Sequence, residues 1–285
     1  MLKKTLFLLA AAALLLSLAG CGVVTGLLFQ NSTESGGGKP TEFQPEDTGS
    51  ASQPEGTEPE TEAVPDYDAQ LALIANACDT WVKSDSFDRY SYSVTDLDQN
   101  GRLEVIATVC AGSGMFSYTD IWEVNEGCDG LSLCDGSAFG DNSQPDLVSA
   151  QETTAYYVPH DGADYGTYHY VFTDYIRNGA AESMQILQTL SLSQHTIVLR
   201  QLAVRHQTYD PETEQETVTY SADSGEEISE EAYLAAADDF FEGMEKYKAR
   251  FAWFSPAQEE LQGMTVEQWL SELRTLWQGF ALEKQ

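Results

Sequence analysis

The sequence predicts an α+β fold: a largely antiparallel β-sheet domain with an N-terminal helix and C-terminal helices, after a disordered tether. Apolar residues recur at helical spacing near residue 71, alternate with a period of two from about residue 90 to 221, and return to helical spacing after residue 228. A helix, a long series of strands and then helices is the order typical of this class. The chain has no internal repeat of fixed period, which argues against a solenoid or a propeller.

The first predicted helix opens the folded part, and strand-like runs follow it. One helix face carries the apolar residues Leu71, Ile74, Ala75, Cys78, Trp81 and Val82. The run from Leu103 to Cys110 is largely apolar on both faces, as a central strand is. The other runs lie at 90–94, 117–125, 154–158, 167–177, 184–190, 195–206 and 216–221, with Gly, Asp and Asn between them.

Three helix starts are predicted near the end of the chain. Ser229 can cap a helix whose face carries Leu234, Ala237, Phe240, Phe241 and Met244. The run Ser255-Pro256-Ala257-Gln258 is a second start, with proline at the first helical position. Thr265 and Gln268 form the capping box of a third helix. Its apolar residues are Trp269, Leu270, Leu273, Leu276, Trp277 and Phe280.

Charge excludes one broad class of partner. The 285 residues include 46 Asp and Glu against 14 Lys and Arg, which gives a formal net charge of −32. Nucleic-acid phosphates and anionic headgroups repel such a chain, so we expect no nucleic acid and no polybasic membrane binding. Hydrophobic residues make up 42% of the chain, which is enough for a packed core.

Residues 1–20 read as a signal peptide. Lys3 and Lys4 precede an apolar run from Leu6 to Leu16, which is too short to span a bilayer comfortably. The run ends in Leu18-Ala19-Gly20-Cys21, which resembles the bacterial lipobox at all four positions. The resemblance implies cleavage before Cys21 and a diacylglycerol on its thiol. It also implies attachment to the extracytoplasmic face of the bacterial cell membrane.

Residues 21–65 follow as a lipidated cysteine and a tether. From Asn31 to Pro65 the composition is dominated by Ser, Thr, Gly, Pro and Glu, and only Phe43, Ala51, Ala63 and Val64 are apolar. Such a segment cannot bury enough surface to offset its ordering entropy, so we expect it to be disordered. The extracytoplasmic domain is then 66–285. A long acidic tether after a lipobox resembles Gram-positive surface lipoproteins, whose domains stand off the membrane.

The sharpest chemical motif runs from Asp96 to Glu104. Asp96, Asp98 and Asn100 occupy positions 1, 3 and 5 of a D-x-D-x-[DN]-G loop, the Arg102 carbonyl is the position-7 ligand, and Glu104 falls at position 9. Hard oxygen ligands at this spacing suit Ca²⁺, and the glycine at position 6 permits a sharp turn. Position 12, where an EF-hand has a bidentate Glu, is Ala107. We therefore expect weak binding, with a Kd of about 10⁻⁴–10⁻³ M.

The loop resembles the calcium loops of integrin-type β-hairpin repeats, Asp-x-Asp-x-Asn-Gly-x-x-Glu before an apolar strand. That pattern is frequent in clostridial surface lipoproteins, and the resemblance implies location and metal but no activity. The alternative is a plain β-turn, since Asn-Gly is the preferred type I′ pair and Asp suits the first turn position.

Four cysteines follow Cys21. Cys128 and Cys134 flank a short glycine-containing loop and could close as a disulfide, with a stabilisation of about 2–2.5 kcal/mol. Cys78 and Cys110 could pair or remain buried thiols. The chain has no CxxC, and its four histidines lack ligand spacing, so no zinc site is expected from sequence.

Two functions remain open. The first is a non-catalytic binding module that is anchored to the membrane by lipid, is stabilised by structural Ca²⁺, and recognises an extracytoplasmic ligand, either a cell-wall glycan or a protein. The second is a cell-wall-associated hydrolase of glycan or peptide, with Asp or Glu residues or His160 and His169 in catalytic roles. A solute-binding lipoprotein fits less well, because 220 residues are few for two lobes and α/β alternation is missing. In the tyrosine-rich run 155–175, Tyr168, Tyr170 and Phe172 are expected to alternate onto a core face.

Overall fold

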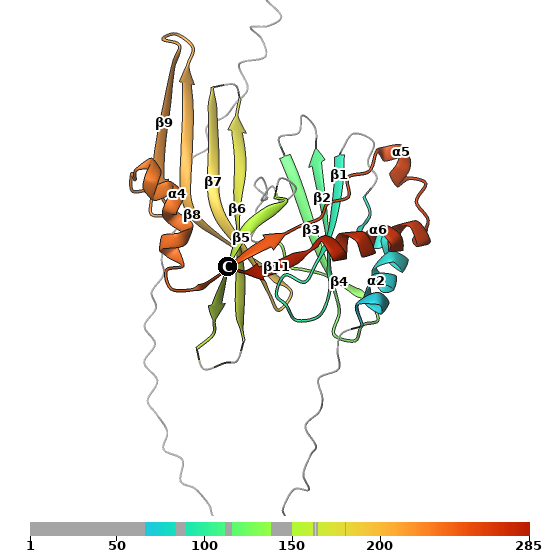
Figure 1. Cartoon of the computed structure of the whole chain (residues 1–285). Helices are drawn as coiled ribbons and strands as arrows, with labels where there is room; N and C mark the ends of the chain where they lie inside the picture. Colours follow the sequence, from blue (N-terminus) through green and yellow to red (C-terminus); the bar gives the residue numbers. More distant parts are fainter. Residues whose placement is uncertain are drawn as a thin grey trace, which may run out of the picture. The chain divides into compact units, whose positions relative to one another are not determined.

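The structure is a computed structural model that describes residues 66–83, 89–111, 116–137 and 150–285 except 162, 164 and 180. The predicted signal peptide, Cys21 and tether lie outside the described residues. The described residues belong to one compact unit, Thr61–Gln285. The predicted fold class is confirmed, because antiparallel sheets are combined with helices near both ends of this unit (Figure 1).

The first sheet follows the strand order of the chain. Its strands pair antiparallel in the order β1-β2-β3-β4 within the described residues. Their bounds are β1 (Arg89–Thr95), β2 (Glu104–Ala111), β3 (Phe116–Val124) and β4 (Leu131–Leu133). This order needs only hairpin connections, as the period-two runs separated by short turns predict.

In the second sheet the last two strands of the chain pair beside the first strand of this sheet, β5. In the described residues its antiparallel order is β11-β10-β5-β6-β7-β8-β9. The bounds are β5 (Glu152–Pro159), β6 (Gly166–Asn178), β7 (Glu182–Ser193), β8 (Thr196–Asp210), β9 (Gln215–Ala222), β10 (Glu245–Arg250) and β11 (Ala281–Lys284). The sequence analysis did not predict β4, β10 or β11.

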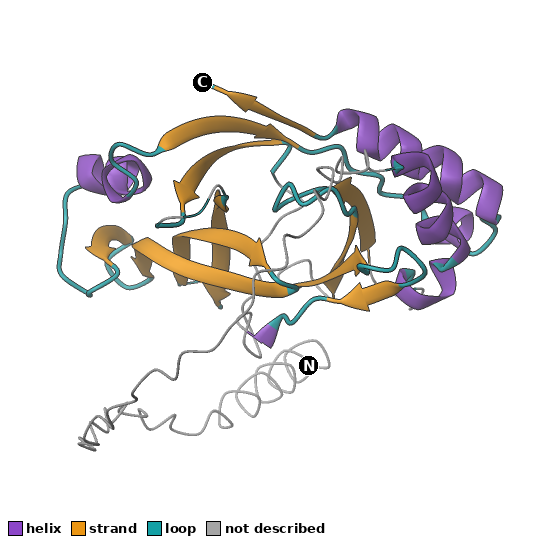
Figure 2. Ribbon diagram, turned by 90° about the horizontal axis from the view of Figure 1, so that it is seen from below, coloured by secondary structure: helices purple, strands orange, loops and turns teal. Residues whose placement is uncertain are grey.

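The helices lie outside the two sheets. Their bounds are α2 (Tyr67–Asn76), α3 (Cys78–Trp81), α4 (Glu230–Phe240), α5 (Gln258–Leu261) and α6 (Val266–Gly279). α2 and α6 lie together against the four-stranded sheet, and α4 lies beside β8 and β9 (Figures 1 and 2). None of the helices in the described part of the chain is long and apolar enough to cross a membrane.

Each face of the four-stranded sheet has its own apolar core. Val105, Ala107 and Val109 of β2 pack on the helix side, where Trp81, Tyr92 and Trp269 make edge-to-face contacts with ring centroids 4.8–5.4 Å apart. The alternate residue Ile106 faces the seven-stranded sheet, in a core shared with residues such as Tyr170, Phe172 and Leu190. Because side chains alternate along a strand, Glu104 also faces the space between the sheets.

The helix predictions near the end of the chain are partly wrong. The Thr265–Gln268 capping box is present at the start of α6, and Ser229 caps α4. The second helix begins at Gln258 with Ala257 as its cap, because the Ser255 hydroxyl lies 2.6 Å from that of Ser91 instead of capping.

The predicted apolar face of the first of these helices is largely solvent-exposed. Leu234 is 72% exposed, and Phe240 and Met244 are also exposed. Phe241 of the predicted face is buried, stacked on Tyr156, and Tyr233 is buried against Tyr220 of β9. The helix rests on the outer edge of the seven-stranded sheet, where only part of its surface is covered.

The tyrosine-rich segment divides between core and surface. Tyr170 and Phe172 are buried between the sheets and Tyr168 packs beside them, as predicted. Tyr165 and Tyr175 are exposed. One strand, β6, therefore supplies both core residues and surface aromatic residues.

Candidate metal centre

The Asp96–Glu104 segment connects β1 to β2 directly after their last paired position. Thr95 and Glu104 are the last cross-strand partners before the loop opens. Gly101 has a φ of +81°, which a side chain would strain, and Gln99 also lies in the left-handed region. The glycine at position 6 of the predicted calcium loop therefore makes the sharp turn that this position requires.

Hydrogen bonds between residues close in sequence orient the side chains of the loop. The Gly101 amide donates to Asp96 Oδ2 at 3.2 Å, and the Asn100 amide donates to Asp98 Oδ1 at 3.3 Å. With the loop held in this way, carboxylate oxygens of Asp96, Asp98 and Glu104 lie within 4.8 Å of one another. Three of the predicted ligand side chains are therefore brought together.

The other two predicted ligands are placed differently. The Asn100 side-chain oxygen accepts from the Arg102 amide at 2.7 Å, while its Nδ2 donates to Asp98 Oδ2 and to Glu123 Oε1 at 3.0 and 2.6 Å. Asn100 thus turns its donor, not its acceptor, toward the carboxylates. For Arg102 the predicted ligand is the carbonyl, and its guanidinium extends to Glu123 at 3.0 Å.

Two carboxylate oxygens of the cluster are buried without a hydrogen-bond partner. Glu104 has no exposed surface and Asp96 is 4% exposed. Glu104 Oε2 accepts from the Thr95 hydroxyl at 2.8 Å and the Leu97 amide at 2.9 Å, but Glu104 Oε1 and Asp96 Oδ1 have no hydrogen-bond partner among the described residues. A buried oxygen with no donor costs about 1–3 kcal/mol, and more when it is charged. A bound cation would remove that cost.

Burial and mutual repulsion raise the pKa values of these acids. Desolvation is the main cause for Asp96, whose pKa rises to about 7, with the Asp98 charge next. Desolvation followed by the Glu123 charge raises the pKa of Asp98 to about 6. The pKa of Glu104 lies well above its usual value, again through burial and then the charges of Asp96 and Asp98. Without a cation, these acids hold protons more strongly than exposed acids do.

Two distant residues hold the loop backbone in place. The side chain of Gln70, buried on α2, donates to the Gly101 carbonyl and accepts from the Leu103 amide, both at 2.8 Å. From the other sheet, the Tyr170 hydroxyl donates to the Leu97 carbonyl at 2.7 Å. The loop is thus bound to the helix layer on one side and to the seven-stranded sheet on the other.

Sequence reasoning missed Glu123. This β3 residue is the direct cross-strand partner of Glu104 and has no exposed surface. Its Oε1 contacts Arg102 and Asn100, and its Oε2 contacts His195 Nδ1. The sequence could have indicated this residue, because in the predicted strand 117–125 Glu123 lies two positions after Ile121 and therefore on the same face. A chain with 46 acidic residues offers too many such positions for that signal to select one.

The remaining predicted site residues are scattered. Cys21 lies outside the described residues. Cys128 and Cys134 are both free, the first exposed and the second buried, so the disulfide that their spacing allows is not formed here. Ala107, at the position of the missing twelfth ligand, faces the helix-side core.

The histidines considered for a hydrolase lie on β6 or beside it. His160 is exposed and lies 2.8 Å from the Thr167 hydroxyl. His169 neighbours Tyr170 in sequence and therefore faces away from the shared core, against Phe241. Neither histidine joins the carboxylate cluster of the loop.

Comparisons with protein-family models, with curated proteins and with solved structures match the chain to none of them.

Proposed function

We propose that the chain is an extracytoplasmic lipoprotein, held at the membrane by a diacylglycerol on Cys21, with a non-catalytic binding domain stabilised by one Ca²⁺. The calcium ligands are the side chains of Asp96, Asp98, Asn100 and Glu104 and the carbonyl of Arg102. The sequence motif supports the anchor and the location. The geometry of the loop supports the metal.

The observation that carries the calcium proposal is the pair of buried, unpartnered oxygens, Asp96 Oδ1 and Glu104 Oε1. A plain Asn-Gly turn has no need of buried carboxylates, because its residues stabilise it by local hydrogen bonds. The spacing of the ligands within nine residues, with only oxygen donors, favours Ca²⁺ over softer metals. Asn100 can serve as a ligand after its side-chain amide turns over.

The burial of the cluster favours a structural role for it over hydrolysis. Raised carboxyl pKa values are also found in general acids. A catalytic acid must touch its substrate, however, and Glu104 and Asp96 are 0% and 4% exposed. A cell-wall glycan strand could not reach them without opening of the core.

A surface on the second sheet has the chemistry of a neutral glycan site. A shallow hollow of about 80 Å³ is lined by Tyr175 of β6, Tyr209 of β8 and the polar side chains of Arg177, Glu182 and Gln207. Both tyrosines are more than 40% exposed. Aromatic rings can pack on the apolar faces of sugars while the polar groups bind hydroxyls. The net charge of −32 argues against an anionic glycan.

Melting curves of the full chain, purified in detergent, test the calcium proposal. Millimolar Ca²⁺ should raise the melting temperature above its value in EDTA by a few degrees. Binding only to the folded state stabilises it by about 1.4 kcal/mol when free Ca²⁺ is ten times the Kd. Mg²⁺ at the same concentration is the control and should have a smaller effect, because it prefers strict octahedral geometry. A melting temperature that does not change with Ca²⁺ would show that the loop is an ordinary β-turn and not a calcium site.

A further inference from the structure

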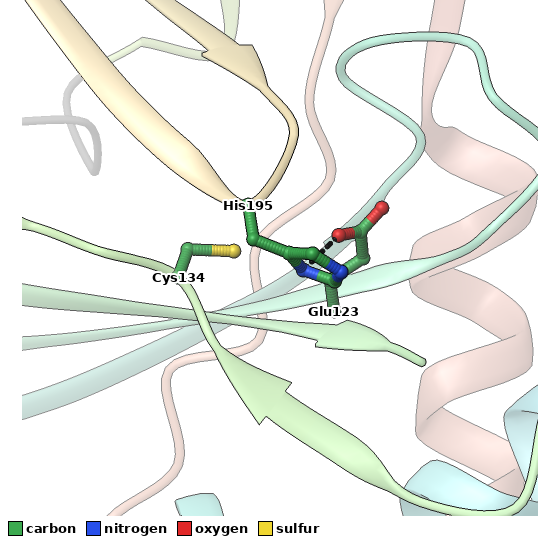
Figure 3. Close-up of side chains that lie close together, drawn as sticks. All are labelled: Glu123, Cys134 and His195. Atoms are coloured by element: carbon green, nitrogen blue, oxygen red, sulfur yellow. Dashed lines mark ion pairs between the residues drawn. The ribbon is translucent and has the colours of Figure 1, made fainter. Parts of the chain in front are cut away.

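A second group of metal-ligating side chains lies beyond the calcium loop. Glu123 on β3, Cys134 just after β4 and His195 in the β7–β8 turn each place one ligand atom within 4.8 Å of the other two. In Figure 3 the Cys134 sulfur points toward His195, whose ring faces the Glu123 carboxylate. The three residues are 11 and 61 positions apart in the chain, so only the fold brings them together.

The atoms of this group that face one another have few other partners. Glu123 Oε2 and His195 Nδ1 are both buried and contact each other as an ion pair, and among the described residues neither has a further hydrogen-bond partner. Glu123 has no exposed surface, and Cys134 is 3% exposed with a free thiol. A carboxylate oxygen, an imidazole nitrogen and a thiol sulfur that converge in a largely buried place are the donor types of a zinc site.

Backbone hydrogen bonds fix the positions of the segments that carry Cys134 and His195. Gln194 and His195 both have positive φ, which gives the two-residue β7–β8 turn its shape. The Asp135 amide donates to the His195 carbonyl at 2.7 Å, and the Ile197 amide donates to the Asp135 carbonyl at 3.0 Å. The turn of the seven-stranded sheet is thus fastened to the segment that carries Cys134. The backbone can therefore stay in place, while the Glu123 and His195 side chains, which contact each other here, must move apart to admit an ion.

The other oxygen of Glu123 is held by separate partners. Arg102 Nη2 lies 3.0 Å from Oε1, and Asn100 Nδ2 donates to the same oxygen at 2.6 Å. These contacts orient the carboxylate and leave Oε2 directed at His195, and the Arg102 contact persists when the Asn100 amide turns over to bind calcium. Partners of this kind around a metal ligand commonly contribute 10–100-fold to affinity.

We propose that Glu123, Cys134 and His195 bind a Zn²⁺ ion that links the two sheets. Nitrogen, sulfur and carboxylate donors suit Zn²⁺, whereas Ca²⁺ takes oxygen donors only. Three protein ligands leave the fourth tetrahedral position to water. The thiol must lose its proton to solvent when the Cys134 sulfur binds the ion. The proposal does not depend on calcium in the neighbouring loop.

Cobalt substitution tests this site directly. Co²⁺ added to the full chain in detergent, with Ca²⁺ present in excess, should bind with one-to-one stoichiometry and give a thiolate-to-cobalt charge-transfer band in the near ultraviolet. Zn²⁺ should remove the band by displacement. Wild-type protein that binds no Co²⁺, or binds it without this band, would overturn the proposal without any variant.

Variants then assign the ligands. Cys134→Ser should abolish the charge-transfer band, whereas Cys128→Ser, at an exposed cysteine six residues earlier, should leave it unchanged. His195→Asn should weaken Zn²⁺ binding about tenfold or more, because asparagine accepts the positive φ of the turn but removes the imidazole. A band that survives Cys134→Ser places the metal at another thiol and refutes the site.

A final variant separates this site from the calcium loop. Asp96→Asn with Asp98→Asn should leave the cobalt stoichiometry and the charge-transfer band unchanged, even where the calcium-dependent rise in melting temperature is lost. Loss of the band in this double variant, with the fold intact by circular dichroism, would show that the two clusters are one site and overturn the proposal of a separate zinc centre.

Discussion

Glu104 and Glu123 are direct cross-strand partners on β2 and β3, and neither side chain has exposed surface. Like charges at such positions destabilise a sheet, so each carboxylate needs its own compensation. Glu123 contacts the cationic side chain of Arg102 and the His195 ring. Within the described residues, Glu104 receives only the neutral donors of Thr95 and Leu97. The uncompensated charge therefore lies on the loop side, where the predicted calcium ligands converge.

Removing the charge of two loop acids should abolish the response to calcium. Asp96→Asn with Asp98→Asn keeps side chains that suit a turn but removes two anionic ligands, so Ca²⁺ should no longer raise the melting temperature. Asp223→Asn with Asp239→Asn removes the same charge at exposed positions and serves as the control. An undiminished calcium shift in the loop variant would show that the ion binds elsewhere.

The pH dependence of stability without calcium should come largely from the same acids. The folded-state pKa values of Asp96 and Asp98 are raised from 3.8 to about 7 and about 6. Folding therefore gains from protonation at low pH, and this contribution is lost as pH rises through 6 to 7. In EDTA the melting temperature should fall between pH 5 and pH 8. Saturating calcium should flatten this fall.

The loop variant provides the control for that pH profile. Acids whose pKa is lowered, such as Asp238 and Glu245, titrate below pH 5 and contribute little between pH 5 and 8. The lowered pKa of His169 acts in the opposite direction, since burial disfavours its charged form. Asp96→Asn with Asp98→Asn in EDTA should therefore reduce the fall, and the remainder should come from Glu104, whose pKa is raised mainly by its own burial. If the melting temperature of this variant depends on pH as that of the wild type does, other titrating groups cause the pH dependence.

Gln70→Ala should destabilise the loop from a distance. The change removes two hydrogen bonds to the backbone at Gly101 and Leu103, and the Leu103 amide is left buried without its acceptor. We expect a loss of about 2–3 kcal/mol in the free energy of unfolding, measured in urea, and weaker calcium binding. Asn76→Ala, at an exposed position of the same helix, should change the free energy of unfolding and the calcium affinity only slightly. Equal urea midpoints for wild type and Gln70→Ala would contradict this account.

The tyrosines at the hollow on β6 and β8 should contribute to glycan binding. Tyr175→Ala and Tyr209→Ala should each weaken retention on neutral cell-wall glycan by about 2- to 10-fold, the range expected for loss of one aromatic contact. Tyr165→Ala is the matched control, because Tyr165 is 65% exposed but does not line the hollow. Retention that is equal in all three variants would favour a protein ligand at another surface.

Cys21→Ala should release the protein from membranes. Without the thiol there is no site for the diacylglycerol, so the chain should appear in the soluble fraction or remain as an uncleaved precursor. Fractionation followed by mass spectrometry of the N-terminus checks this. A shortened mature form that still sediments with membranes would show that the lipobox interpretation is wrong.

Local patterns in the sequence determined most of the elements and selected one of the two proposed metal clusters. Alternation, together with one run that is apolar on both faces, predicted eight of the described strands, and the Thr265–Gln268 capping box predicted the start of α6 to the residue. Nine consecutive residues were enough to select Asp96, Asp98 and Glu104, because a calcium loop is set by spacing along the chain. These features depend on neighbours in sequence and can be read from it.

Features that depend on distant partners were decided by the tertiary structure. β10 reads Glu-Lys-Tyr-Lys-Ala-Arg, a charged run that becomes a strand because β5 and β11 pair with it on either side. Gln70 and Tyr170 hold the calcium loop from a helix and from the opposite sheet. Glu123, Cys134 and His195 converge only when the β7–β8 turn meets the end of β4. Each side chain alone has an ordinary sequence context, and its chemistry arises from burial beside groups that are remote in the chain.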